Sequence, residues 1–170
     1  MIKKWLSTIF IILICYLLQT TLFFYIRLAG VVPNLLVIVV VSTAYLRGQK
    51  DGLFTGLICG LLSDMIFGSV IGLHGLLYML VGYLTGYGKI IYWRNNFSVP
   101  LILIGLGDII YNLLFYVFEF LLRGKLNLVS YIIEIMLPEM VYTMLIGVVL
   151  YKIIWCVDRL VLPKDSEEDI

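Results

Sequence analysis

Six runs of apolar residues, separated by short polar segments, occupy almost the whole chain. A bilayer core is about 30 Å thick, and a helix of roughly 20 residues crosses it with its backbone hydrogen bonds satisfied internally. The pattern therefore predicts six membrane-spanning helices. They cover residues 5–26, 31–46, 52–67, 71–87, 98–122 and 129–157. The second, third and fourth runs are short, so these helices are expected to tilt little or to thin the bilayer locally.

The count of spans has one alternative, because the third and fourth runs also read as a single long helix, which would give five spans. The segment Gly-Ser-Val-Ile-Gly at residues 68–72 offers a turn between them. With the amino terminus inside, nine Lys and Arg residues fall on the cytoplasmic side and three outside, which favours six spans. The nine are Lys3, Lys4, Arg47, Lys50, Lys89, Arg94, Lys152, Arg159 and Lys164, and the three are Arg27, Arg123 and Lys125. We predict six spans with both termini in the cytoplasm and an uncleaved first span, since no small-residue cleavage site follows its apolar run.

Composition agrees with this fold class. Apolar residue types make up 62% of the 170 residues and charged types 14%, against about 45–50% and about 25% in soluble domains. We predict an all-α, polytopic membrane protein with a single six-helix domain over residues 1–162. The remaining residues, 163–170, are polar and acidic and are expected to form a short cytoplasmic tail.

Motifs of enzymes and of nucleic-acid-binding proteins are absent from the sequence. Cys15, Cys59 and Cys156 fall in three different spans without paired spacing, and His74 is the only histidine, so no metal site is predicted. The chain has no Gly-rich phosphate loop, no hydrolase nucleophile elbow and no basic aromatic patch. We predict no catalytic residue, no cofactor and no nucleic-acid partner.

Glycines recur at every fourth residue along the third span. Gly52, Gly56, Gly60, Asp64 and Gly68 therefore share one face of the predicted helix. Glycine lets a neighbouring backbone approach closely and gain van der Waals contact. This face is expected either to pack inside the bundle or to bind another subunit, which includes a second copy of the chain in a homodimer.

Asp64 lies on this glycine face, towards the outer end of the span. A carboxylate in the hydrocarbon core costs at least about 2.5 kcal/mol, so it should face protein or water and have a partner. His74 and Ser63 are the nearest candidates in the sequence. The alternative is that Asp64 holds the following turn by accepting backbone N–H bonds. If Asp64 only holds the outer helix ends, Asp64→Asn should be mild, whereas a role for its charge would make Asp64→Asn nearly as damaging as Asp64→Leu.

Further acidic and amide side chains lie in the last two spans. Asp108, Asn112 and Glu119 are separated by four and seven residues, which predicts one shared helix face in the fifth span. Glu134 lies in the outer half of the sixth span. A polar pocket open to the outside is one interpretation, and neutralisation of the acids by the outer-loop cations, without a pocket, is the other. The pocket candidates are Gln19, His74, Asp108, Asn112, Glu119 and Glu134.

Two prolines mark positions within the predicted spans. Pro33 lies near the start of the second helix, where its missing N–H costs nothing. Pro138 lies inside the sixth span, followed by Glu139. Because proline removes a backbone hydrogen bond, the sixth helix is predicted to bend or break there.

Several short pieces, taken in order, resemble the rod shape-determining protein MreD family. They are Leu-Leu-Gln-Thr-Thr at 17–21, Pro-Asn-Leu-Leu-Val-Ile at 33–38, Gly52, Gly56, Gly-Leu-Leu-Ser-Asp at 60–64, Gly68, Gly-Leu-His-Gly-Leu at 72–76, Tyr78 and Gly-Tyr-Leu at 82–84. The resemblance covers roughly the first half of the chain, and the second half is similar only in hydropathy. It therefore adds nothing to the interpretation of Asp108, Glu119 or Glu134.

The resemblance implies a non-enzymatic subunit of the bacterial cell-elongation machinery in the cell (inner or plasma) membrane. Proteins of this family work with the membrane-anchored protein MreC, and through it with MreB filaments and the wall synthase formed by RodA and PBP2. Their fold is thought to be similar to the six-helix substrate-binding subunits of energy-coupling-factor vitamin transporters.

That second similarity supplies the main alternative function, a substrate-binding transporter subunit. The first span of such subunits usually presents an Ala-x-x-x-Ala surface to the coupling partner. Here the first span contains no alanine, and the whole chain has only Ala29 and Ala44. The alternative is thereby weakened. A third interpretation, a structural membrane bundle, predicts neither a partner nor a ligand.

Overall fold

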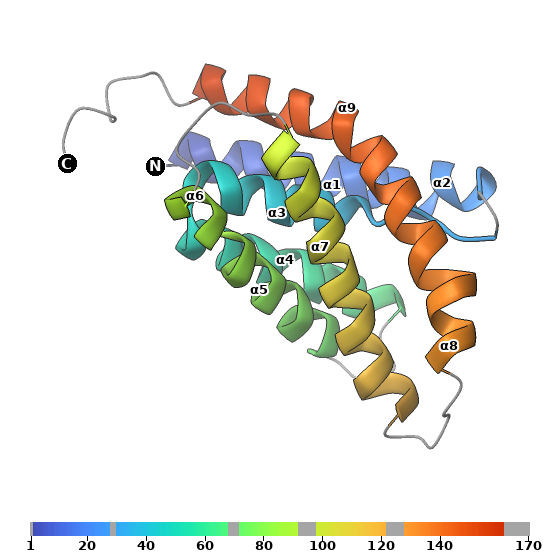
Figure 1. Ribbon diagram of the computed structural model, residues 1–170. Coiled ribbons are helices and arrows are strands. Elements are labelled where there is room, and N and C mark those ends of the chain that lie inside the picture. Colours follow the sequence, from blue (N-terminus) through green and yellow to red (C-terminus); the bar gives the residue numbers. More distant parts are fainter. Residues whose placement is uncertain (1, 28–29, 68–71, 92–97, 122–127, 162–170) are drawn as a thin grey trace.

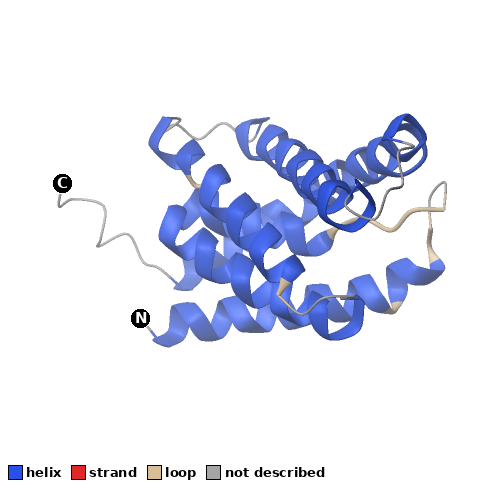
Figure 2. Cartoon of the chain, turned by 90° about the horizontal axis from the view of Figure 1, so that it is seen from below, coloured by secondary structure: helices blue, strands red, loops and turns tan. Residues whose placement is uncertain are grey.

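The computed structural model describes residues 2–27, 30–67, 72–91, 98–121 and 128–161. Within these ranges the chain is helical apart from short connections, so the all-α prediction is confirmed (Figure 2). The helices are α1 (Ile2–Thr20), α2 (Leu22–Tyr25), α3 (Leu35–Arg47), α4 (Gln49–Phe67), α5 (Leu73–Thr85), α6 (Tyr87–Ile91), α7 (Ser98–Tyr116), α8 (Leu128–Tyr131) and α9 (Leu137–Val161), with π-helical segments at Val117–Leu121 and Ile132–Met136. Each predicted span overlaps one of these helices or a consecutive group of them.

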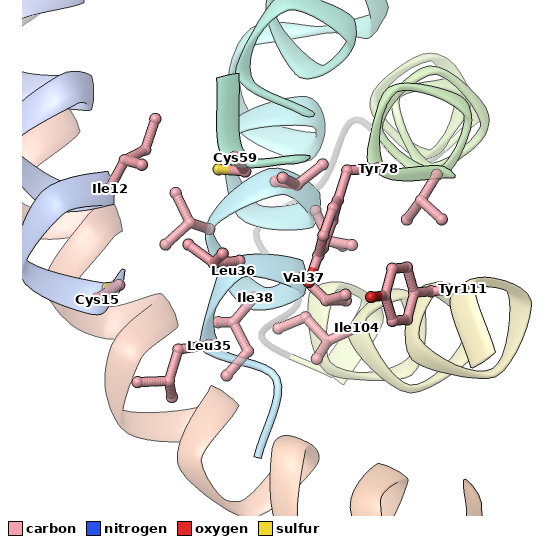
Figure 3. Close-up of a cluster of buried hydrophobic side chains, with 14 of the residues drawn as sticks. Ile12, Cys15, Leu35, Leu36, Val37, Ile38, Cys59, Tyr78, Ile104 and Tyr111 are labelled. Atoms are coloured by element: carbon pink, nitrogen blue, oxygen red, sulfur yellow. The ribbon is translucent and has the colours of Figure 1, made fainter. Parts of the chain in front are cut away.

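The α3 helix forms the centre of the bundle (Figures 1 and 3). Every residue from Leu35 to Ala44 is buried. Its neighbours are α1, α4, α5, α7 and α9, and side chains such as Ile12 of α1 and Ile104 of α7 point towards it. A helix that is apolar on all sides is stable in this position because protein covers every face.

The α4 and α5 helices run antiparallel and side by side. Gly52 at the start of α4 faces Gly82 near the end of α5, and Gly60 faces Gly75. This arrangement is incompatible with one continuous helix through the third and fourth runs. The turn residues 68–71 lie outside the described residues, and Gly72 precedes α5 with a φ of 98°, a left-handed conformation that glycine adopts without strain.

The sixth helical segment is not broken at Pro138. The chain remains helical through α8, the π-helical segment Ile132–Met136 and α9. Leu137 donates its backbone N–H to the Ile132 carbonyl in a wide π-type bond. Pro138 follows in the first turn of α9, where a missing N–H is tolerated. Of the predicted bend or break, the break is absent here, and a π turn directly precedes the proline.

Three of the described helical stretches are long and apolar enough to cross a membrane, by length and composition. They are Lys3–Thr20, Ser98–Glu119 and Leu128–Val161, and Leu35–Arg47 is a shorter apolar helix. Large apolar side chains on the outer face of α1 are open to the surroundings, with Leu6 69% exposed. Such a surface suits contact with lipid. Six crossings and the orientation of the termini stay predictions.

The start of α1 and the end of α9 lie at the same end of the bundle (Figure 1). The end of α3, the start of α4 and α6 lie there too, and we call this the amino-terminal end. The predicted tail, residues 163–170, lies outside the described residues.

Candidate functional site

The Asp64 carboxylate, near the end of α4, bonds to the start of α5. Its Oδ1 accepts a hydrogen bond from the His74 backbone N–H at 3.0 Å and lies 2.9 Å from His74 Nδ1. Its Oδ2 accepts from the backbone N–H groups of Gly72, at 2.9 Å, and Gly75, at 3.1 Å. Asp64 and His74 are both buried. We call this arrangement the Asp64 latch.

The latch contains both kinds of partner that the sequence offered as alternatives, the His74 side chain and the backbone of the turn. Amides at a helix start have no acceptor within their own helix. Asp64 supplies that acceptor to α5 from a neighbouring helix. Because a carboxylate only accepts hydrogen bonds, His74 Nδ1 carries hydrogen where it faces Oδ1.

The glycine face of α4 packs directly against the backbone of α5. A Cβ added at Gly56 would lie closer than 3.0 Å to the backbone of Tyr78, and one at Gly60 would overlap the backbone of Gly75. At Gly52 the added atom would meet the Gly82 carbonyl and the α3 residue Ala44. The face of α4 that these three glycines share is therefore occupied by contacts within the chain.

A second buried junction joins α3, α5 and α9 at Asn34. The Asn34 side-chain oxygen accepts from the Val37 N–H at 3.2 Å, which caps α3, and from the Tyr78 hydroxyl at 2.7 Å. The Asn34 backbone N–H donates to Thr143 Oγ1 at 3.0 Å. We call this the Asn34 junction. It fixes the start of α3 to two other helices.

Gln19, a candidate for the polar pocket, instead supports the same helix start. Its Oε1 accepts from the Leu36 backbone N–H at 3.3 Å. Side chains therefore satisfy two of the first amides of α3, one from α1 and one from Asn34. The contact is structural and occupies the side-chain oxygen of Gln19.

Aromatic rings connect the Asp64 latch to the Asn34 junction. The rings of Tyr78 and Tyr111 stack with centroids 4.6 Å apart, and His74 lies 6.3 Å from Tyr111 and 5.3 Å from Phe115. These contacts bring α5 against α7. Buried side chains are thus in contact from α4 through α5 and α7 to α3 and α9.

Asp108 and Asn112 share a buried face of α7. Asn112 Nδ2 donates to the Asp108 carbonyl at 3.1 Å, and Asn112 Oδ1 accepts from the Tyr131 hydroxyl at 3.1 Å. The Asp108 side chain is fully buried, and neither of its carboxylate oxygens has a hydrogen-bond partner among the described residues. Glu139 of α9 lies close enough to Asn112 and to Asp108 to interact electrostatically with both. We call these four residues the Asp108 cluster.

In the Asp108 cluster, the two carboxylate oxygens of Asp108 can still accept hydrogen bonds or interact with a positive charge. An unpaired carboxylate in a low-dielectric interior is costly. In the part of the chain that the structure describes, no group of three or more His, Cys, Asp or Glu side chains is arranged to hold a metal ion.

Two further predicted residues lie in the π-helical segments. Glu119 is only partly buried and belongs to the π-helical segment Val117–Leu121, while Glu134 is exposed in the segment Ile132–Met136. Gly68 lies outside the described residues. A common pocket for these candidates stays a prediction. Gln19 caps α3, His74 joins the latch, and only Asp108 and Asn112 lie together.

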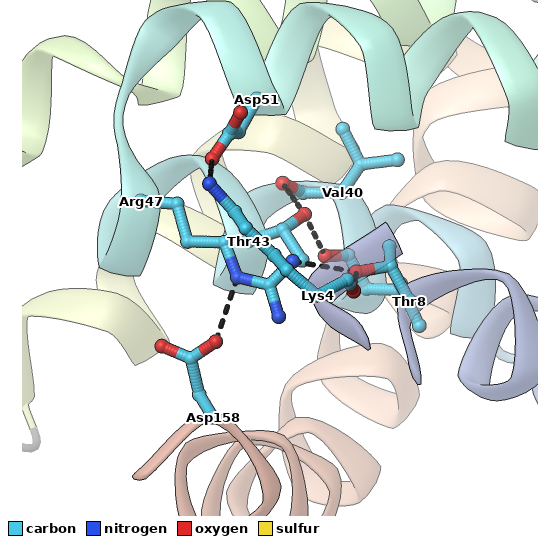
Figure 4. A network of polar contacts seen from close by, with 8 residues as sticks. Lys4, Thr8, Val40, Thr43, Arg47, Asp51 and Asp158 are labelled. Carbon is cyan, nitrogen blue, oxygen red and sulfur yellow. Dashed lines mark hydrogen bonds and ion pairs between the residues drawn. The ribbon is translucent and has the colours of Figure 1, made fainter. Parts of the chain in front are cut away.

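Charged side chains connect four helices at the amino-terminal end (Figure 4). Arg47, the last residue of α3, pairs with Asp158 of α9 at 2.6 Å and donates to Thr8 of α1 at 2.5 Å. Lys4 of α1 pairs with Asp51 of α4. The Arg47 and Asp158 side chains are 5% and 14% exposed, so this ion pair is largely removed from solvent.

Sequence reasoning missed several of these residues. Thr143, Tyr131 and the Arg47–Asp158 pair were not singled out, and Asn34 entered only through the family resemblance. Asn34 had a usable signal, since asparagine directly before an apolar run is a preferred helix cap. The partners of Asn34 gave no signal, because they lie on helices distant in the sequence.

The fold and these buried contacts define an all-helical protein of membrane type, in which buried polar side chains of the described residues join neighbouring helices. A comparison with protein families matches residues 1–160 to the family described as rod shape-determining protein MreD. The chain therefore belongs to the MreD family. This match confirms the resemblance and extends it over the second half of the chain. Comparisons with curated proteins and with solved structures gave no match.

Membership in this family assigns the chain to rod shape determination and to a family of membrane proteins. The MreD family is associated with the shape machinery that also includes MreB and MreC.

Proposed function

We propose that this protein is a non-enzymatic subunit of the bacterial cell-elongation machinery, in the inner membrane. It scaffolds an MreC-like membrane-anchored protein and, through that protein, MreB, RodA and PBP2. The observation that carries this proposal is the family match over residues 1–160.

The way α3 is held supports a scaffold role. Its start is fixed by the Asn34 junction, and its end is fixed by the Arg47–Asp158 pair. The α4 and α5 backbones touch along the glycine face. Partner binding to a preorganised surface avoids the entropic cost of ordering it.

Affinity purification from gently solubilised membranes tests the proposal. Co-purification of an MreC-like protein is the expected result, together with loss of rod shape when the protein is depleted. Capture of ATP-binding-cassette subunits without an MreC-like protein would contradict the scaffold role and support the transporter alternative.

We propose six spans with both termini in the cytoplasm. The test is cysteine accessibility labelling in a background that lacks the three native cysteines. Labels at positions 50 and 94 are expected from the cytoplasmic side and a label at position 123 from outside, although Arg94 and Arg123 lie outside the described residues. External labelling at position 94 would rule out this topology.

The transporter alternative has one observation in its favour, the unpaired carboxylate of Asp108 inside the bundle. A substrate-binding subunit would use such an acceptor for a ligand with a donor or a positive charge. Uptake of a vitamin that depends on this chain, and is lost in Asp108→Asn, would support it. Normal uptake in a deletion strain with abnormal cell shape would exclude it.

A further inference from the structure

A cavity of about 480 Å³ opens at the amino-terminal end of the bundle. A water molecule takes about 30 Å³ in the liquid, so the space exceeds what a few waters fill. The cavity lies where the end of α3, the start of α4, the end of α5 and α6 meet, beside the start of α1. Its lining residues are Lys4, Arg47, Gly48, Gln49, Lys50, Asp51, Gly86, Lys89 and Ile90.

The charge of this cavity is strongly positive. Lys4, Arg47, Lys50 and Lys89 line it against the single carboxylate of Asp51, which leaves a formal charge of +3. Lys4 is paired with Asp51, and Arg47 is paired outside the cavity lining. Lys50 and Lys89 are exposed and form no ion pair in the described ranges of the chain. Two cations are therefore available to an anion.

The two available lysines come from two helices, α4 and α6, whose ends are in close contact behind the cavity. Lys50 belongs to the first turn of α4, where the helix dipole adds positive partial charge. The Lys89 side chain extends from α6 over Gly48, with its Cδ 3.9 Å from the place of a Cβ there. A Cβ at Gly86 would lie closer than 3.0 Å to the Gln49 backbone, so the helix ends behind the cavity are in direct contact.

An apolar surface adjoins the cationic one. Ile90 lines the cavity and is 69% exposed, next to Lys89. A small inorganic anion has no apolar part that could pack against this surface. An amphipathic ligand can contact both surfaces, because its charged group binds the lysines while its hydrocarbon packs along the outside of the bundle.

We propose that this cavity binds the phosphate headgroup of an anionic phospholipid, with Lys50 and Lys89 as the cations that select it. Helix ends of a membrane bundle lie at headgroup depth, and basic cavities between such helices bind anionic headgroups. The acyl chains lie along the apolar surface that begins at Ile90. The inference requires only that the bundle lies in a bilayer, so it is independent of the proposed protein partners.

Native mass spectrometry of the full chain in mild detergent tests the proposal. The probes are dioleoylphosphatidylglycerol, dioleoylphosphatidylcholine and inorganic phosphate. The double variant Lys50→Gln/Lys89→Gln removes the two selecting cations. The control Lys3→Gln/Lys152→Gln makes the same change of charge at exposed lysines that do not line the cavity.

The parent should bind phosphatidylglycerol in clear preference to phosphatidylcholine, and excess inorganic phosphate should not displace it. Binding should weaken by about fivefold for each selecting lysine removed, since one surface cation contributes roughly that factor. The control should retain the parent's affinity. Equal binding of both lipids, unchanged binding in the Lys50→Gln/Lys89→Gln variant, or equal loss in the control would overturn the lipid site. Displacement by inorganic phosphate would overturn the lipid as the ligand.

Discussion

The Asp64 carboxylate on α4 receives two bonds from one residue of α5, the backbone N–H and the ring Nδ1 of His74, at 3.0 and 2.9 Å. Both are made by the same oxygen, which leaves the other oxygen for Gly72 and Gly75. A single side chain thus satisfies the start of a neighbouring helix and orients an imidazole ring. Every acceptor position that Asp64 uses faces an N–H donor.

This geometry predicts that Asp64→Asn is damaging even though the role of Asp64 is structural. Asparagine replaces one acceptor oxygen by a donor NH₂ group, which would face either two backbone N–H groups or the two His74 donors. We expect about 1–3 kcal/mol of lost stability, measured by thermal unfolding of the purified protein in detergent. The mild effect expected from the sequence assumed that one accepting oxygen was enough.

Ser63→Ala is the matched control for Asp64→Asn, because Ser63 is the buried neighbour in sequence and takes no part in the latch. It should stay close to the parent. An Asp64→Asn protein as stable as Ser63→Ala would mean that the latch does not hold α5.

Asn34 and Tyr78 should be energetically coupled. Asn34→Ala removes the helix cap and leaves the buried Tyr78 hydroxyl without an acceptor, for a loss of about 1–3 kcal/mol. In a Tyr78→Phe background the same substitution should cost less by about 0.5–1.5 kcal/mol, because no hydroxyl is left unpaired. Denaturant or thermal unfolding of the four proteins of the cycle gives the coupling.

Tyr131→Phe provides the control cycle, since its hydroxyl bonds Asn112 and not Asn34. Asn34→Ala and Tyr131→Phe should be additive. Additivity of Asn34→Ala with Tyr78→Phe as well would contradict the observed bond.

Gly56 should not tolerate even a methyl group. The Cβ of alanine would overlap the Tyr78 backbone, so Gly56→Ala is expected to lose about 1–3 kcal/mol through overpacking. The Cβ of Gly147→Ala, in α9, would meet side chains and no backbone, the nearest atom being Ile104 Cδ1 at 3.3 Å, and the substitution gains helix propensity. It should be neutral or stabilising by the same thermal assay. Equal behaviour of the two variants would show that the α4–α5 contact is looser than described.

The two ion pairs at the amino-terminal end should differ in strength. Asp158→Ala leaves the nearly buried Arg47 without its carboxylate, at an expected cost of about 3 kcal/mol. Asp51→Ala breaks a more exposed pair with Lys4, and about 1 kcal/mol or less is expected. Unfolding measurements at low and high salt check both values. A larger effect for Asp51→Ala would reverse the assignment of the buried pair.

Contacts between residues that lie close together in the sequence could be predicted from the sequence. Asp64 and His74 lie on either side of one turn, so a hairpin of two helices was enough to bring them together. The four-residue spacing of Gly52, Gly56 and Gly60 likewise fixed a shared helix face. Neither argument needed the position of any third helix.

Other contacts depend on how the helices surround α3, which hydropathy does not encode. Asn34 and Thr143 are 109 residues apart, and Arg47 and Asp158 are 111 apart. Every apolar run looks alike in lipid, so no pattern marked α3 as the one covered on all sides. No pattern in the sequence marked the π turn ahead of Pro138, where the helix continues without a break.

The central position of α3 has a consequence for how the protein is made. Synthesis proceeds from the amino terminus, so α3 leaves the ribosome before α4, α5, α7 and α9, which later cover it. During that interval the helices that cover its residues from Leu35 to Ala44, other than α1, have not yet been made. The hydroxyl of Thr143, which accepts from Asn34, arrives with the last helix. The core of this protein is therefore enclosed last, although its central helix is among the first parts to be synthesised.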